Sequence, residues 1–261
     1  MIEFSSGEIR YYKFQNLEGQ GLYHGIFTRH GGYSPPPWES LNFGASVGDE
    51  PQRVMMNRKV ALDALDIPIE SVYDLYQVHS TEVVITDRPL QVNENHRKAD
   101  AIITKRPNVT LMMRFADCVP IFLFDPVHRV IAIIHAGWIG TVEKISQKTI
   151  RSMVDIFRTK PSDVIAAIGP SIGPDHYSIG DDVIARITKS FGNISDQFLT
   201  DTNGKCFFDM WKANQQLLVE NDVTNIEVAE ICTQCNLSNW YSHRGEHAKT
   251  GRFGAVLGLY A

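Results

Sequence analysis

Residues 116–138 read ADCVPIFLFDPVHRVIAIIHAGW, which is two apolar runs joined by a short polar segment. The runs at 119–124 (VPIFLF) and 130–134 (VIAII) are apolar at successive positions, as expected for strands that are buried on both faces. The intervening DPVHR (125–129) has the length and composition of a hairpin turn. This stretch therefore predicts a buried antiparallel β-hairpin.

The polar ends of this hairpin are Cys118 and His135. If Phe124 pairs with Val130, Val119 lies opposite His135, and the Cys118 backbone comes within about 5–7 Å of it. Strict pairing would direct the two side chains to opposite faces, so we expect a bulge or the strand end to correct their direction. The prediction is a thiol and an imidazole at one rim of the sheet. The alternative is a buried structural cysteine and a hydrogen-bonded histidine.

The segment HAGWIG (135–140) is expected to form a glycine-containing turn leading into a helix over 141–157, with Thr141 as its N-cap. Free backbone N–H groups at such a helix start are suited to bind an anion.

The remaining sequence alternates strand-like and helical patterns without repeats or linkers. A single α+β domain with mixed sheets, spanning residues 1–261, fits this irregular order better than regular βαβ winding. The helix at 51–67 is expected to begin behind the capping candidate Asp49 and to stop at Pro68. The other predicted strands are 25–28, 82–87, 100–105, 164–169 and 226–232, and the other helices are 181–191 and 209–220.

Composition excludes several functional classes. The net charge of -5 argues against nucleic acid as a partner. No apolar stretch approaches the roughly 18–20 residues that span a bilayer, and the N-terminus lacks the apolar core of a secretion signal. We therefore expect a cytoplasmic protein without membrane contact. In a reducing compartment, cysteines are buried thiols, metal ligands or nucleophiles, and this chain has four: Cys118, Cys206, Cys232 and Cys235.

Cys118 and His135 do not complete a zinc site, because catalytic zinc usually has three protein ligands. His79 in QVHS (77–80) is the best third candidate, since it lies in a polar segment just before a strand. The CTQC segment, with Cys232 and Cys235, is a single CxxC and favours a structural role.

Eight motifs occur in order along nearly the whole chain, and together they resemble the YfiH-like family, known both as laccase-domain polyphenol oxidases and as purine nucleoside phosphorylases. They are FTRHGGYS (27–34), LNFG (41–44), QVHS (77–80), ADAIIT (99–104), ADCVPI (116–121), HAGW (135–138), GPSIGP (169–174) and SHRGEHAKTGR (242–252).

The resemblance implies a layered α/β fold with mixed sheets and a zinc site whose ligands match His79, Cys118 and His135. It also implies phosphorolysis of adenosine, inosine and methylthioadenosine, with adenosine deamination as a second activity. The substrates would be purine nucleosides and phosphate. The sequence departs from the family pattern at four positions: Ile139 replaces a usual Arg, Asp175 and His176 stand where many relatives have cysteines, and Arg114 replaces an apolar residue.

Other polar residues within or near these motifs are candidate substrate contacts. Arginine suits phosphate because its planar fork forms paired bonds, and the candidates are Arg29, Arg58, Arg244 and Arg252. Asn42 and Gln77 are expected to bind the base or the ribose. Asp117 is expected to orient a ligand or to transfer a proton.

Three other functions remain open. Two histidines and a cysteine also suit copper, and copper can occupy such a site in vitro, which would fit a polyphenol oxidase. However, the nine histidines form no His-x-His pair, as a multicopper oxidase would require. Cys118 could instead be the nucleophile of a cysteine hydrolase. The third alternative is a non-catalytic metal-binding module.

Overall fold

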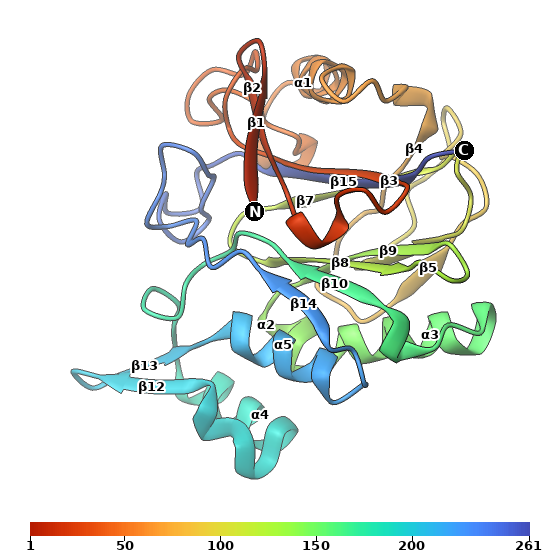
Figure 1. Ribbon diagram of the computed structural model, residues 1–261. Coiled ribbons are helices and arrows are strands. Elements are labelled where there is room, and N and C mark those ends of the chain that lie inside the picture. Colours follow the sequence, from red (N-terminus) through yellow and green to blue (C-terminus); the bar gives the residue numbers. More distant parts are fainter.

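The predicted hairpin lies at the centre of the protein (Figure 1), and the computed structural model describes residues 1–261. Its strands are β8 (Val119–Asp125) and β9 (Val130–Ala136), and every residue in both is buried. They occupy the middle of a six-stranded sheet with the order β14-β10-β8-β9-β6-β5. The other strands are β5 (Val83–Ile85), β6 (Ala101–Thr104), β10 (Ile165–Ile168) and β14 (Asn225–Val228). The β10–β14 and β5–β6 pairs are parallel and the others antiparallel, so the sheet is mixed.

The predicted hairpin register was wrong by one residue. Asp125 pairs with Val130, so Pro120 lies opposite His135. Residues that are paired across an antiparallel ladder share a face, and so do residues two apart along a strand. Cys118 therefore falls on the same side as His135 without a bulge.

The turn itself explains the difference in register. The carboxylate of Asp125 accepts hydrogen bonds from the backbone N–H groups of Val127 (2.9 Å) and His128 (3.0 Å). This local bonding is typical of aspartate at the start of a tight turn. With these bonds the connection consists of residues 126–129 only, and Asp125 is the last residue of the strand.

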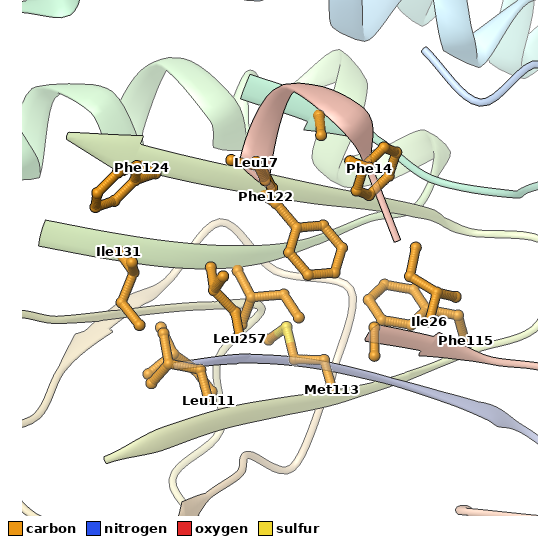
Figure 2. Close-up of a cluster of buried hydrophobic side chains, with 14 of the residues drawn as sticks. Phe14, Leu17, Ile26, Leu111, Met113, Phe115, Phe122, Phe124, Ile131 and Leu257 are labelled. Atoms are coloured by element: carbon orange, nitrogen blue, oxygen red, sulfur yellow. The ribbon is translucent and has the colours of Figure 1, made fainter. Parts of the chain in front are cut away.

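A second six-stranded sheet packs against the first, in the order β1-β2-β3-β15-β7-β4. Only the β4–β7 pair is parallel. Between the sheets lies a cluster of 26 buried residues, in which Phe122 of the hairpin faces Phe115 and Leu257 of the second sheet (Figure 2). The strands are β1 (Ile2–Ser6), β2 (Ile9–Lys13), β3 (Leu22–Phe27), β4 (Val72–Tyr73), β7 (Thr110–Phe115) and β15 (Phe253–Leu259).

Helices cover the outer faces of both sheets, as Figure 1 shows. Helix α1 (Pro51–Asp63) covers the second sheet, while α2 (Trp138–Val142), α3 (Ile145–Phe157) and α5 (Met210–Val219) cover the hairpin sheet. Helix α4 (Asp181–Phe191) lies beyond them, with a small sheet of β11 (Ser178–Ile179), β12 (Leu199–Thr202) and β13 (Lys205–Phe208). The predicted layered α+β domain with mixed sheets is confirmed. No helix has the length and apolar character needed to cross a membrane.

The predicted helix over 141–157 is two helices. Helix α2 begins at Trp138, and Lys144 adopts a left-handed conformation (φ 62°) before α3 begins. Thr141 is therefore not an N-cap. It lies buried inside α2, where its Oγ1 accepts a hydrogen bond from Asn214 (2.9 Å). Helix α2 thus occupies the second half of the segment that was expected to be a glycine turn, and the first two residues of that segment belong to β9.

Helix α1 also differs from its prediction. It ends at Asp63, four residues before Ile67, and Asp49 does not cap it. The carboxylate of Asp49 instead accepts hydrogen bonds from Ser34 Oγ (2.6 Å) and Asn42 Nδ2 (2.8 Å). Asp49 therefore ties the preceding loops together.

Candidate metal centre and adjoining cavity

The fold brings three separate segments together at the rim of the hairpin sheet. Cys118 immediately precedes β8, His135 lies near the end of β9, and His79 lies on the loop between β4 and β5. Cys118 Sγ lies 3.7 Å from His79 Nε2, and the two imidazole rings are 4.9 Å apart between centroids. The three potential ligand atoms all lie within 4.8 Å of one another.

One buried carboxylate, Asp100, holds this arrangement. Its Oδ1 accepts hydrogen bonds from His135 Nδ1 (2.8 Å) and from the His79 N–H (3.1 Å). Its Oδ2 accepts from the N–H groups of Ser80 (2.6 Å) and Val78 (3.2 Å) and from Ser80 Oγ (2.8 Å). Carboxylates commonly fix metal-binding histidines in this way. Asp100 therefore leaves Nε2 of His135 available to a ligand and supports His79 in its left-handed conformation (φ 58°).

Electrostatics favour the thiolate form of Cys118. Burial alone would raise the pKa of this thiol, but the charge and hydrogen bonds of His135 and His79 outweigh burial and lower the pKa to about 6. Burial likewise disfavours the charged form of His135, but Cys118 and Asp100 together raise its pKa to about 9. The thiolate is the form of cysteine that binds metals and acts as a nucleophile. The site therefore holds a reactive thiolate at neutral pH.

The donor set fits a metal ion. Two imidazole nitrogens and one thiolate converge from three rigidly supported segments, which is the ligand number of a catalytic site with one open position. Gly137 makes room for this convergence. A Cβ at residue 137 would lie 2.9 Å from His79 Cδ2 and 3.1 Å from Cys118 Sγ, so only glycine allows α2 to start this close.

The three side chains open into a cavity of about 410 Å³. Pockets of about 300–1,000 Å³ typically bind small molecules. Cationic, aromatic and polar side chains share its wall, namely Arg114, Arg244, Arg252, His243, Tyr76, Trp138, Tyr177 and Gln77. The cavity thus combines a metal-binding edge with groups suited to an anion and to an aromatic base.

Comparison with known proteins places this architecture in a family. The family model for multi-copper polyphenol oxidoreductase laccase matches residues 23–260. The crystal structure of YfiH from Bacillus licheniformis superposes with a TM-score of 0.90 at 33% identity, covering 97% of each chain. The chain belongs to the YfiH-like, laccase-domain family.

Two curated YfiH-like relatives carry names that state an activity. Purine nucleoside phosphorylase YlmD from Bacillus subtilis (strain 168) is 32% identical over 254 residues, covering 94% of this chain and 91% of the relative. Adenosine deaminase RL5, from an unknown prokaryotic organism, is 30% identical over 232 residues, covering 85% and 87%. Because both relatives cover most of this chain and carry enzyme names, this member of the family is an enzyme.

Four residues that the sequence singled out as site residues beside the metal ligands line the cavity: Gln77, Asp117, Arg244 and Arg252. The amide of Gln77 is already bonded at both ends to the backbone of Arg114 (2.8 and 2.9 Å). The carboxylate of Asp117 accepts from Thr233 Oγ1 (2.7 Å) and from the Arg244 N–H (2.6 Å). Asp117 thus holds a cavity wall, while the histidine-orienting role expected of it is performed by Asp100.

The structure does not bring Arg29, Asn42 or Arg58 to this cavity. Arg29 donates to backbone carbonyls and pairs with Glu246 (3.0 Å), while Arg58 donates to the Phe43 carbonyl and pairs with Asp74.

Asn42 is fully buried, and its Oδ1 accepts from the N–H groups of Gly44 (2.9 Å) and Arg252 (2.8 Å). The polar groups of all three predicted substrate contacts therefore bond to other parts of the protein. Asn42 nevertheless positions the cavity residue Arg252.

Sequence reasoning gave no role to the aromatic wall or to His243, and it noted Arg114 only as a departure from the family pattern. Arg114 departs from the family pattern and lines the cavity, whereas Ile139, in place of the usual arginine, does not. Arg114 pairs with Asp74 (2.8 Å), so its guanidinium is partly committed to the fold. Arg252 lies in one of the eight motifs, and this was the available signal for its importance.

Proposed function

We propose that this YfiH-like enzyme is a zinc-dependent purine nucleoside phosphorylase with a single catalytic domain over residues 1–261. Adenosine, inosine and methylthioadenosine are the proposed substrates, and adenosine deamination is the proposed second activity. The observation that carries the proposal is the His79–Cys118–His135 donor set at the edge of an arginine-containing cavity. The name of the Bacillus subtilis relative supports the reaction class.

Zinc is the metal that the donor set favours. Imidazole and thiolate are its usual protein ligands, and three of them leave one position open. His79, Cys118 and His135 would hold the ion, and bound zinc would supply a Lewis acid at this edge of the cavity. Copper binds similar donors more tightly in vitro, so the metal content after purification depends on the metals supplied.

Phosphate has two candidate partners in the cavity. Arg244 donates through Nη1 to the carbonyl and Oγ of Ser178 (both 3.1 Å), and Arg252 donates through Nη1 to the carbonyls of Thr250 and Gly251. These bonds hold each guanidinium in place and leave Nε and Nη2 free to donate. A fixed guanidinium can bind phosphate through paired, charge-assisted hydrogen bonds.

The proposed reaction needs little beyond placement and charge. A phosphate oxygen attacks the anomeric carbon of the ribose, the carbon–nitrogen bond breaks with its electrons going to the base, and a proton reaches the base. The products are free base and ribose 1-phosphate. Positive charge builds on the sugar, and the adjoining phosphate stabilises that charge while the arginines keep the phosphate in line.

The base would lie against the aromatic wall of Tyr76, Trp138 and Tyr177. His243, which lines the same cavity, is a group suited to exchange a proton with it. Burial, followed by the charge of Arg252, lowers the pKa of His243, which favours the neutral ring that can donate one hydrogen bond and accept another.

The test is the phosphate dependence of base release from inosine. Wild-type protein should form hypoxanthine and ribose 1-phosphate only when phosphate is present. Arg244→Ala and Arg252→Ala should raise the phosphate KM more than the inosine KM. Losing a charged hydrogen bond costs about 1.5–3 kcal/mol, which is roughly ten- to hundredfold in kcat/KM. Arg151→Ala, at an arginine exposed on α3, is the matched control.

Other products would identify the alternatives. Equal base release without phosphate, together with free ribose, would mean that the enzyme is a hydrolase and the proposal is wrong. Inosine and ammonia from adenosine would establish the second activity, which the name of the RL5 relative supports. Inactivation by an alkylating agent to the same extent with and without chelator would favour Cys118 as a nucleophile over a metal ligand.

A further inference from the structure

A second cluster of metal-binding side chains lies apart from the first. It consists of Asp175 and His176 from the loop between β10 and β11, and Cys232 and Cys235 from the segment after β14. The four potential ligand atoms all lie within 4.8 Å of one another. The CxxC therefore gains two partners from a loop more than 50 residues earlier in the sequence.

The sulfur–nitrogen distances in this cluster are close to those of tetrahedral zinc. His176 Nδ1 lies 3.6 Å from Cys235 Sγ and 3.9 Å from Cys232 Sγ. Zinc bonds of about 2.3 Å to sulfur and about 2.0 Å to nitrogen separate two such ligands by roughly 3.5 Å in a tetrahedron. Asp175 Oδ1 lies 2.8 Å from the same nitrogen, which is shorter than the roughly 3.3 Å between an oxygen and a nitrogen ligand of one zinc, so Asp175 would move slightly away from His176 to become the fourth ligand.

The backbone is shaped around one of the sulfurs. Cys232 Sγ accepts hydrogen bonds from the N–H groups of Gly173 (3.2 Å) and Cys235 (3.4 Å). Such bonds stabilise a thiolate. A Cβ at residue 173 would lie 3.2 Å from this sulfur and 2.9 Å from Asp175 Oδ1, so glycine permits the close approach. All four cysteines are free thiols.

We propose that Asp175, His176, Cys232 and Cys235 bind a second zinc ion. Two thiolates and an imidazole are soft and borderline donors that select zinc over magnesium or calcium. Four protein ligands leave no open position, which is the pattern of a structural site. This inference is independent of the reaction proposed above, because it concerns a different set of ligands.

The second zinc would link two segments that contact the cavity, namely the loop between β10 and β11 and the segment after β14. Thr233, between the two cysteines, donates to Asp117 (2.7 Å), which neighbours Cys118 in sequence. The other segment carries Tyr177, whose ring lies 5.1 Å from the guanidinium of Arg244. Binding at the second cluster therefore sets the distance between the base-binding wall and the candidate phosphate contact.

The test is zinc per chain in full-length protein purified without chelator. Wild type should hold about two equivalents, whereas Cys232→Ser, His176→Ala and Cys118→Ser should each hold about one. Cys206→Ser is the matched control and should keep two, because Cys206 belongs to neither cluster. One equivalent in wild type that persists in Cys232→Ser would overturn the proposal. A Cys232–Cys235 disulfide in the freshly purified protein would also overturn it.

A measurement on Cys118→Ser keeps the test decisive if Cys232→Ser fails to fold. This variant has no thiolate in the first site, so cobalt added to its zinc-free form can show thiolate-to-cobalt charge transfer only through the second cluster. A strong charge-transfer band is expected. Its absence would contradict the second site while leaving the phosphorolysis proposal untouched.

Discussion

Asp100→Asn is the substitution that most directly tests how the candidate metal centre is built. Asparagine has the same shape as aspartate but replaces one oxygen by an NH2 group that cannot accept a hydrogen bond. Asp100 is fully buried and accepts five hydrogen bonds, two at Oδ1 and three at Oδ2. In either orientation of the amide, at least two of these donors would face the NH2 group.

The expected loss follows from these contacts. A buried donor that is left without an acceptor costs about 1–3 kcal/mol, so two of them cost about 2–6 kcal/mol. For a domain of this size, at about 2–4 °C per kcal/mol, that lowers Tm by roughly 4–24 °C. Zinc affinity should fall about ten- to hundredfold, as for other carboxylates that orient a metal-binding histidine.

The difference in stability should also depend on pH. Hydrogen bonds from His135 and its neighbours outweigh burial and lower the pKa of Asp100 from 3.8 to about 2. A carboxylate with a lowered pKa stabilises the fold above its unfolded pKa, and that contribution disappears as pH falls through the folded value. The Tm gap between wild type and Asp100→Asn should therefore narrow between pH 4 and pH 2.

The assay is competition for zinc with a chromophoric chelator, combined with thermal melts of the metal-free protein. Asp125→Asn is the matched control, because Asp125 is equally buried and bonds within the hairpin turn, away from the three candidate ligands. It should lose stability and keep its zinc affinity. If Asp100→Asn loses stability but binds zinc as tightly as wild type, Asp100 does not orient the ligands.

Two further outcomes follow from the geometry of the same site. In chelator-treated protein, alkylation of Cys118 should rise with a midpoint near pH 6, because the thiolate forms above its lowered pKa. Cys206 is the control: burial raises the pKa of its thiol, so it should be alkylated only at higher pH. An alkylation midpoint near pH 9 for Cys118 would contradict the lowered pKa of its thiol. Gly137→Ala should weaken zinc binding at least about tenfold, because the added Cβ would displace His79. Gly180→Ala is the control and should bind zinc as tightly as wild type. If Gly137→Ala also binds zinc as tightly as wild type, this packing argument is wrong.

The hairpin could be predicted because its signal is local. Two apolar runs and a turn lie within 20 residues, and burial on both faces leaves an unbroken hydrophobic pattern. The central strand β15 gave no such signal, because it contains Gly254 and Gly258, and glycine weakens a strand pattern. The rings of Phe43 and Tyr23 pack directly over these glycines, where a Cβ would collide with them. The reason for both glycines is thus a tertiary contact.

The same distinction separates the predicted site residues that the fold brings together from those that it does not. His79 was found because a polar segment before a strand is unusual, but its convergence with the hairpin depends on Asp100, whose bonds reach two distant segments. Arg29 and Arg58 looked like phosphate contacts because they lie within or near motifs. Sequence does not show that backbone carbonyls and acidic side chains already use both guanidiniums.

Asp117 shows why adjacency in sequence is a poor guide to chemistry at this rim. Its position beside Cys118 suggested a proton carrier, yet both carboxylate oxygens accept bonds from the C-terminal third of the chain. Its left-handed backbone (φ 78°) turns the side chain toward that region, a conformation that is costly for a residue with a Cβ. The two bonds, to Thr233 and Arg244, offset that cost. Asp117 therefore couples the position of Cys118 to the cavity wall and to the segment that carries Cys232 and Cys235.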